Sequence, residues 1–273
     1  MQKSFETPGP ISLYVELGSG SVTLRCDPVA ETTVDVTGQD ADDVLVEQRG
    51  NQIVVIAPKN RTGFLGRSNA IAVHVTMPEG SELATKLGSA DVTATGRLGE
   101  TRIKTGSGDV TLDHVDGDAL VEAGSGDIEV GETTGDLRVK SGSGDVEVGR
   151  AGGSALVSTG SGDVEIGSAL QAVTVKSGSG DMLVRDAQAD VELSTASGDL
   201  VVELMRRGQL AAKNVSGDIR VGIPAGTPVW TDVSSMTGHI RSSLQGAGQP
   251  AEGQDYVELR AKTISGDILL ETR

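Results

Sequence analysis

The feature that most restricts the fold of this chain is a repeat with a period of 18 residues. Aspartates recur at this spacing through the middle of the 273-residue sequence, and a last one follows after 19 residues; they are Asp91, Asp109, Asp127, Asp145, Asp163, Asp181, Asp199 and Asp218. A second series lies halfway between them, at Asp118, Asp136, Ser154, Ala172 and Asp190. The underlying unit therefore has nine residues, and two alternating kinds of unit make one structural repeat.

The residues after each aspartate of the first series alternate between apolar and other side chains. The apolar pairs are Val110/Leu112, Ile128/Val130, Val146/Val148, Val164/Ile166, Met182/Val184, Leu200/Val202 and Ile219/Val221. A period of two is typical of a strand with one buried face, and the β-branched and glycine content excludes a helix. We therefore expect Val164 to point inward, and Glu165, Lys140 and Lys176 to point outward.

Each repeat has room for two strands of about five residues and two turns. Coils of this kind, stacked about 4.8 Å apart, predict an all-β solenoid, or β-helix-like stack, in which equivalent residues form ladders. The regular β-solenoid is predicted for residues 81–222. Residues 1–80 lack the nine-residue period and are expected to form an N-terminal β capping region, while residues 223–273 are expected to form an irregular C-terminal β cap that completes the same domain. Caps are expected because an uncovered coil end would template aggregation.

Charge and hydropathy narrow the classes of partner. The formal net charge of −16 argues against nucleic acid, since phosphate binding needs clustered Lys and Arg, and against anionic membrane surfaces. No stretch approaches the roughly 20 apolar residues of a membrane span, and residues 1–6 lack the apolar core of a secretory signal. We therefore expect a cytoplasmic protein that does not insert into a membrane and whose partner is a protein, either a second copy or a different chain.

Residues with catalytic or metal-binding chemistry are few. The single cysteine, Cys26, excludes an intrachain disulfide and a multi-cysteine metal site, and its strand-like surroundings predict a buried thiol. His74, His114 and His239 have no ligand spacing to one another or to Cys26, which argues against zinc. No Gly-x-Ser-x-Gly elbow lies between a strand and a helix. No catalytic residue and no cofactor is therefore expected.

The ladder of aspartates needs a physical explanation, because like charges at strand spacing repel one another. In one interpretation each carboxylate accepts backbone N–H hydrogen bonds at its corner, as in an Asx turn. In the other, a cation binds between coils; calcium is the candidate ion, and its candidate ligands are Asp109, Asp127, Asp145, Asp163 and Asp181. The glycine before each aspartate indicates a corner with a left-handed or crowded backbone, although Ala90 interrupts that column.

A second acidic row, Glu129, Glu147 and Glu165, is expected to face solvent. Some carbohydrate-active β-helices place carboxylates on one face, so a glycan-processing enzyme that depends on Glu147 is an alternative. Aromatic residues, which stack on sugars, make up only 2% of the chain. The sequence therefore predicts that the protein is not an enzyme.

Two segments carry a resemblance to a known family. The signature Ser-Gly-Ser-Gly-Asp-Val of residues 141–146, repeated at 177–182 with Met182 last, and the opening segment 10–22 are similar to a bacterial family of unknown function. Its members are labelled β-strand-repeat proteins or "putative adhesin", and related domains are called toast-rack domains. The resemblance covers nearly the whole chain and implies a right-handed β-solenoid-like fold without catalytic residues.

A second resemblance is to calcium-binding nonapeptide repeats, whose pattern is Gly-Gly-x-Gly-x-Asp-x-apolar-x. Here aspartate follows glycine directly, and only alternate nonapeptides carry Gly-Ser-Gly. A calcium-binding repeat module is therefore a further alternative. The leading hypothesis is a non-enzymatic structural or interaction protein, either a rigid β-solenoid scaffold or an adhesin-like module.

Overall fold

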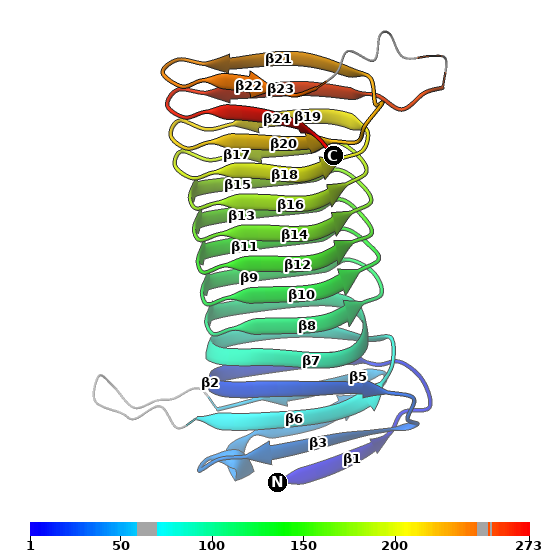
Figure 1. Ribbon diagram of the computed structural model, residues 1–273. Helices are drawn as coiled ribbons and strands as arrows, with labels where there is room; N and C mark the ends of the chain where they lie inside the picture. Colours follow the sequence, from blue (N-terminus) through cyan, green and yellow to red (C-terminus); the bar gives the residue numbers. More distant parts are fainter. Residues whose placement is uncertain (59–69, 245–250, 252) are drawn as a thin grey trace, which may run out of the picture. The chain divides into compact units, whose positions relative to one another are not determined.

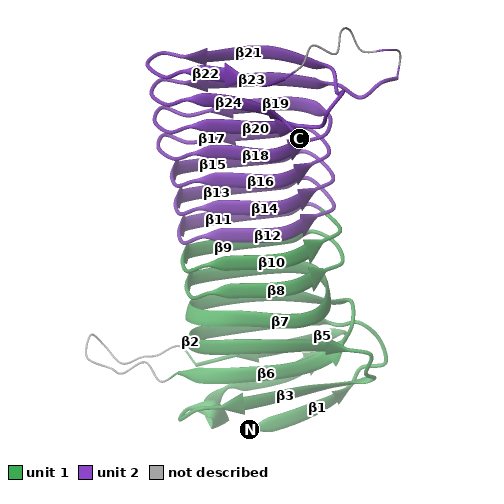
Figure 2. Ribbon diagram, in the orientation of Figure 1, with its two compact units in different colours: residues 1–135 green, residues 136–273 purple. Residues whose placement is uncertain are grey.

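The structure, a computed structural model, describes residues 1–58, 70–244, 251 and 253–273 (Figure 1). The one helix within these ranges is a single 3-10 turn, η1 (Ala41–Asp43), and the other elements are strands. No helix in the described part of the chain is long and apolar enough to cross a membrane. The chain divides into two compact units, residues 1–135 and residues 136–273 (Figure 2).

Unit 2 is a solenoid with two strands per coil. Its β12 sheet contains, in stacking order, β12 (Val146–Ala151), β14 (Val164–Ala169), β16 (Met182–Ala187), β18 (Leu200–Met205), β20 (Ile219–Ile223), β24 (Ile268–Thr272) and β22 (Ile240–Ser242). Its β11 sheet contains β11 (Leu137–Ser143), β13 (Ala155–Ser161), β15 (Val173–Ser179), β17 (Val191–Ser194), β19 (Gly208–Lys213), β23 (Val257–Thr263) and β21 (Val229–Ser235). Both sheets are parallel, and the coils wind right-handed (Figure 1), which confirms the predicted fold class.

The inward rows of the β12 sheet, from β12 to β24, form an aliphatic core. In the β12 sheet Val164 lies between Val146 and Met182, and each of the three is 1% exposed. The next residue, Glu165, points outward and is paired in register with Glu147. The predicted assignment of inside and outside positions is therefore confirmed. This assignment follows from the two-residue period of a strand, because alternate side chains point to opposite faces and the same pattern repeats in every coil.

The glycine column sets how closely the coils approach at their corners. Gly162 has a φ of 127°, and a Cβ there would lie 2.2 Å from the carbonyl oxygen of Gly144 in the preceding coil. The column therefore requires both a left-handed backbone and close packing, two demands that the sequence left open. Ala90, the exception, lies inside the continuous strand β7 (Ser81–Ser107) and does not have a positive φ.

The last strands of unit 2 do not stack in chain order. After β20 the chain forms β21 and β22, and then returns, so that β23 lies between β19 and β21 and β24 lies between β20 and β22. We call the pair β21 and β22 the terminal coil. Within the described residues each of these two strands pairs with one other strand only.

Unit 1 contains further right-handed coils and a set of antiparallel strands. Its strands are β1 (Gln2–Glu6), β2 (Ser12–Asp27), β3 (Glu31–Thr37), β4 (Leu45–Arg49), β5 (Gln52–Ile56), β6 (Ile71–Pro78), β7, β8 (Val110–Val115), β9 (Ala119–Ser125) and β10 (Ile128–Thr133). The long strands β2 and β7 each turn a corner, and they pair in parallel with Leu13 beside Leu83 and Val22 beside Val92. Residues 12–27 thus build a coil although their sequence lacks the nine-residue period.

The outermost layer of unit 1 is antiparallel. Strand β3 pairs antiparallel with β6 and with β1, and β4 pairs antiparallel with β5. This layer buries Val34 and Val36 at 1% and 0% exposure, and Val46 at 2%. The Nζ of Lys3 donates a hydrogen bond of 2.7 Å to the carbonyl oxygen of Val46, which ties β1 to β4. The end of unit 1 is therefore covered by strands that have left the repeat.

Candidate functional site

The aspartate column lies at the corners where each coil enters its next strand. In unit 1 the backbone N–H of Asp109 donates to Oδ1 of Asp91 at 3.0 Å, and that of Asp127 donates to Oδ1 of Asp109 at 2.9 Å. In unit 2 the N–H groups of Asp163 and Asp181 donate in the same way to Asp145 and Asp163, both at 2.8 Å. Each carboxylate therefore joins its coil to the next one along the column.

The interpretation of the aspartates as backbone acceptors is confirmed, but the donor differs from the expected one. An Asx turn uses an N–H of its own corner, whereas here the N–H belongs to the next coil. The second aspartate series does the same: Asp136 accepts from Ser154 N at 2.9 Å and Asp190 from Gln209 N at 2.8 Å. Hydrogen bonds to the ionised form offset the repulsion between neighbouring carboxylates.

The arrangement of the aspartates can be compared with the coordination that calcium needs. The candidate calcium ligands are Asp109, Asp127, Asp145, Asp163 and Asp181. Calcium takes six to eight oxygen ligands, including several carboxylates around one point. In the described residues no three His, Cys, Asp or Glu side chains gather closely enough to hold a metal ion. A linear column of carboxylates that accept N–H hydrogen bonds fits a structural role at the corners better than a calcium site. Calcium binding there stays a prediction.

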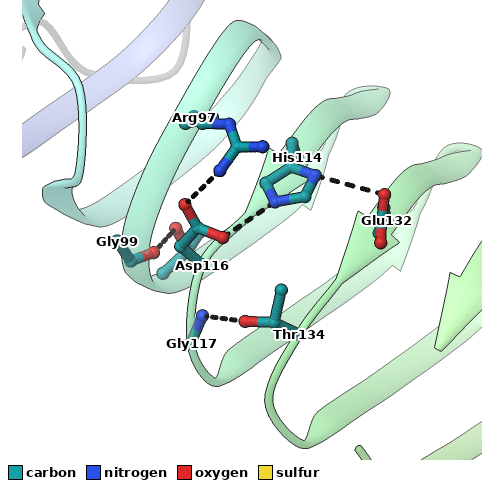
Figure 3. Close-up of polar contacts among 8 residues, drawn as sticks. Arg97, Gly99, His114, Asp116, Gly117, Glu132 and Thr134 are labelled. Carbon is teal, nitrogen blue, oxygen red and sulfur yellow. Dashed lines mark hydrogen bonds and ion pairs between the residues drawn. The ribbon is translucent and has the colours of Figure 1, made fainter. Parts of the chain in front are cut away.

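A denser polar cluster lies in unit 1 around His114 of β8 (Figure 3). The imidazole Nε2 is 2.8 Å from Oδ1 of Asp116, and Nδ1 is 3.4 Å from Oε2 of Glu132 in β10. Arg97 of β7 contacts the other oxygen of Asp116, with Nη1 to Oδ2 at 3.3 Å. Since both ring nitrogens face carboxylates, only the protonated ring can donate to both.

This cluster joins three neighbouring strands of one sheet, β7, β8 and β10, and in the described residues the two ring nitrogens of His114 contact carboxylates. The nearby hydroxyl of Thr134 accepts a hydrogen bond of 3.0 Å from the N–H of Gly117, and Figure 3 shows it directed away from the imidazole. General-base catalysis needs an imidazole nitrogen in reach of the group that it deprotonates. The arrangement therefore fits a cross-brace between coils. Sequence reasoning missed it, although His114 and Glu132 are one 18-residue period apart.

One member of the acidic row that raised the possibility of a glycan-processing enzyme, Glu165, belongs to an ion-pair cluster on the outer face. Glu147 and Glu165 are neighbours in register, and Nη2 of Arg185 lies 2.6 Å from Oε1 of Glu165. Arg185 also reaches Oε1 of Glu203 at 3.5 Å, and its bond to Glu165 raises the pKa of the guanidinium. Arg185 thus holds two outward carboxylates together on the exposed face.

The single thiol is buried as expected. Cys26 is 3% exposed and has no disulfide partner in the described part of the chain. Burial, with smaller contributions from the charges of Asp27 and Glu79, raises its pKa to about 12. The thiol is therefore uncharged at neutral pH and belongs to the core, since nucleophilic cysteine chemistry needs the thiolate.

A row of lysines and serines crosses the outer face of the β11 sheet in unit 2. In stacking order this lysine row consists of Lys140, Ser158, Lys176, Ser194, Lys213, Lys262 and Ser234. Its four lysines are exposed. Lysines on alternate coils, such as Lys140 and Lys176, stand about 10 Å apart, which is twice the strand spacing. The unit thus presents a fixed line of positive charges in a chain with a net charge of −16.

Comparison with known proteins gives one family and a set of solved structures. A family model described as Toastrack DUF4097 matches residues 119–271, more than half of the chain. No curated protein matches the sequence.

Three solved structures are similar over 100% of this chain and 96% of their own. They are a "putative lipid binding protein" from Parabacteroides distasonis ATCC 8503 (15% identity, TM-score 0.49), a "putative adhesin" from Parabacteroides merdae ATCC 43184 (13%, 0.45) and a "putative adhesin" from Bacteroides fragilis NCTC 9343 (11%, 0.37). Since each TM-score is below 0.5, these likenesses carry no further weight.

Proposed function

Because the chain belongs to the Toastrack DUF4097 family, we propose that it is a non-enzymatic interaction module, a rigid β-solenoid scaffold that presents its lysine row to an acidic partner protein. The observation that carries this proposal is that Lys140, Lys176 and Lys213 lie on alternate strands of one parallel sheet. A sheet whose strands are hydrogen-bonded on both sides holds the Cα atoms of its residues at fixed distances. Little conformational entropy of the backbone is therefore lost on binding. A linear acidic segment could then meet several lysines at once.

The charge arrangement supports an acidic rather than a basic partner on this face. Lys176 lies 3.9 Å from Glu192, and Lys262 lies 3.4 Å from Asp232. Ion pairs this exposed contribute little and are readily exchanged for those of a partner. Opposite charges across an interface raise the association rate and disfavour partners of the wrong sign.

A defined probe tests the lysine row. We expect a fluorescent peptide of about ten glutamates to bind the full chain and to be released as salt screens the charges. Lys140→Glu, Lys176→Glu and Lys213→Glu together should abolish binding without lowering the melting temperature, because all three are exposed. The matched control carries the same charge change in unit 1, with Lys86→Glu, Arg102→Glu and Lys104→Glu. Equal binding by both variants, or none by the wild type, would contradict the proposal.

The non-enzymatic part of the proposal has its own test. A catalytic activity that survives purification and is lost on one outward substitution, such as Glu147→Gln, would sink it. A melting temperature that rises with calcium, and rises less in Asp145→Asn, would instead favour the calcium-binding alternative, since ligands of the folded state stabilise it.

Location separates the scaffold from the adhesin-like module. The cytoplasmic location stays a prediction, which detection of the chain in fractionated cells of its source organism can check. Recovery at the cell surface would favour the adhesin-like module.

A further inference from the structure

The terminal coil of unit 2 ends in two unpaired strand edges. β21 pairs with β23 on one side and β22 with β24 on one side, and no described strand pairs with their other sides. Figure 2 shows both strands at the free edge of unit 2. The backbone N–H and C=O groups along such an edge can hydrogen-bond to a further strand.

Inward-facing apolar residues of unit 2 are also exposed at the terminal coil. One inward column continues from Ile219 through Ile268 to Ile240, and the exposed fractions are 1%, 0% and 45%. In the other sheet Ala261 is fully buried, whereas Val233, its neighbour in the terminal coil, is only half-buried. The residue types still follow the inward pattern, but the layer that would cover them is absent from the described residues.

Exposed apolar side chains gather in the same part of the unit. Large apolar residues that are 45% exposed or more include Trp230, Met236 and Ile240 of the terminal-coil segment and Ile264 at the corner beside it. The guanidinium of Arg260 lies 5.8 Å from the centre of the Trp230 ring and covers one side of it. A concentration of exposed apolar surface is typical of association sites.

We propose that the terminal coil is a docking surface for the terminal coil of a second copy of this chain, in a two-fold dimer held by edge-to-edge strand pairing. The occupant must supply two strand edges at the width of a solenoid coil and an apolar row between them. A single strand of another protein would satisfy one edge and leave the other uncovered. An identical coil supplies both.

The charges of the terminal coil indicate how the two copies pair. If β22 lies antiparallel to β21 of the second copy with Arg241 opposite Asp232, then Ile240 lies opposite Val233 and Ser242 opposite Thr231. Residues directly opposite in a sheet share a face, so the inward residues meet each other and the outward charges meet each other. Arg241 is exposed and makes no ion pair in the described part of the chain, while Asp232 contacts Lys262.

Two-fold symmetry makes this pairing occur twice. The axis that brings β22 onto β21 of the second copy also brings β21 onto β22, so that two Arg241–Asp232 pairs form and both edges are used. An interface of this isologous kind closes at two copies. The inference adds an interaction surface to the lysine row and does not depend on it.

Light scattering of the full chain across a concentration series tests the proposal. We expect the wild type to approach twice the chain mass, and Asp232→Arg or Arg241→Asp alone to weaken the dimer at least about tenfold, because each places two like charges opposite each other. An equimolar mixture of the two variants should restore a dimer, since each supplies the charge that the other lost. The double variant Asp232→Arg/Arg241→Asp should restore it as well.

A second variant separates association from folding. Ile240→Asp should abolish the dimer and leave the melting temperature of the dilute chain nearly unchanged, since Ile240 is 45% exposed in one copy. A wild-type mass that stays at one chain at all concentrations would overturn the proposal. So would a mass that grows past two chains, or a dimer that both charge variants leave intact.

Discussion

The outermost strands of unit 1 and those of unit 2 differ in direction, and the apolar residues of these strands differ in how deeply they are buried. In unit 1 the strands β1, β3 and β4 turn antiparallel, and Val36 in β3 is completely buried. In unit 2 the terminal coil stays parallel to its neighbours, and Ile240 is 45% exposed. Among the large apolar residues exposed in the described part of the chain, Leu45 is the one that belongs to unit 1.

The difference shows that a change of strand direction, rather than the loss of the repeat, covers a coil end. Residues 12–27 lack the nine-residue period and still form a parallel coil. In contrast, β3 and β4 run antiparallel to β6 and β5, the strands that pair with β2. Antiparallel strands need only short connections, so a chain can fold back over its own core within a few residues. The segment of unit 2 that leaves the repeat instead returns to insert β23 and β24, and adds parallel strands.

The largest effect is expected in the middle of unit 2, and it sets the scale for both ends. Val164→Asp places a carboxylate in a row that is 1% exposed and should cost about 3 kcal/mol or more of unfolding free energy. Glu165→Gln, one residue away on the outside, should cost about 0.5 kcal/mol or less. Urea denaturation measures both, and equal losses would show that the inside and outside positions are misassigned.

The next effect compares the two ends directly. Val36→Asp should destabilise the chain about as strongly as Val164→Asp, because Val36 of the antiparallel strand β3 is 0% exposed. Ile240→Asp, measured at concentrations where the chain is monomeric, should cost about 1 kcal/mol or less. If the two substitutions had equal effects on the unfolding free energy, the contrast between a covered and an open end would not hold.

A smaller effect separates a corner inside the stack from one beyond it. Gly162→Ala forces a Cβ against the Gly144 carbonyl at a φ of 127° and should cost about 2 kcal/mol or more. Gly226, which precedes the terminal coil, has a φ of 80° but no atom within 4 Å of its would-be Cβ. Gly226→Ala should therefore cost about 1 kcal/mol, from backbone strain alone. Thermal melting of the two variants compares crowding with strain.

The smallest effect concerns acid. The N–H of His239 donates to Oδ1 of Asp267 at 2.8 Å, and this hydrogen bond is the main cause that lowers the pKa of the Asp267 carboxyl. A folded pKa below the unfolded one means that the contact supports the terminal coil above the unfolded pKa and is lost as pH falls through the folded pKa. The chemical shift of the His239 amide proton should follow that titration.

The control for the acid effect is Asp267→Asn, which should remove the titration from the His239 amide signal. A midpoint at or above the pKa of aspartate in an unfolded peptide would contradict the prediction.

Cross-strand contacts show where sequence reasoning stopped. A strict 18-residue offset puts His114 beside Glu132, as found, but puts it beside Gly96 on the other side. The structure puts it beside Arg97, because an irregularity in β7 shifts the register between Ala94 and Arg97. A register shift of one residue changes which side chains meet, and the local alternation of apolar and polar residues does not predict such a shift.

The sequence itself determined the period and the strands. It also determined that Val164 points inward, that Glu165 points outward and that Cys26 is buried. All of them depend on local alternation repeated at a fixed interval, and stacking identical coils leaves one way to bury the same row each time. The tertiary structure alone decided that residues 12–27 form a coil and that β23 and β24 insert before the terminal coil. It also decided that no described strand pairs with the outer edges of this coil. These outcomes depend on which strand edge pairs with which, and that is settled by contacts between residues far apart in the chain.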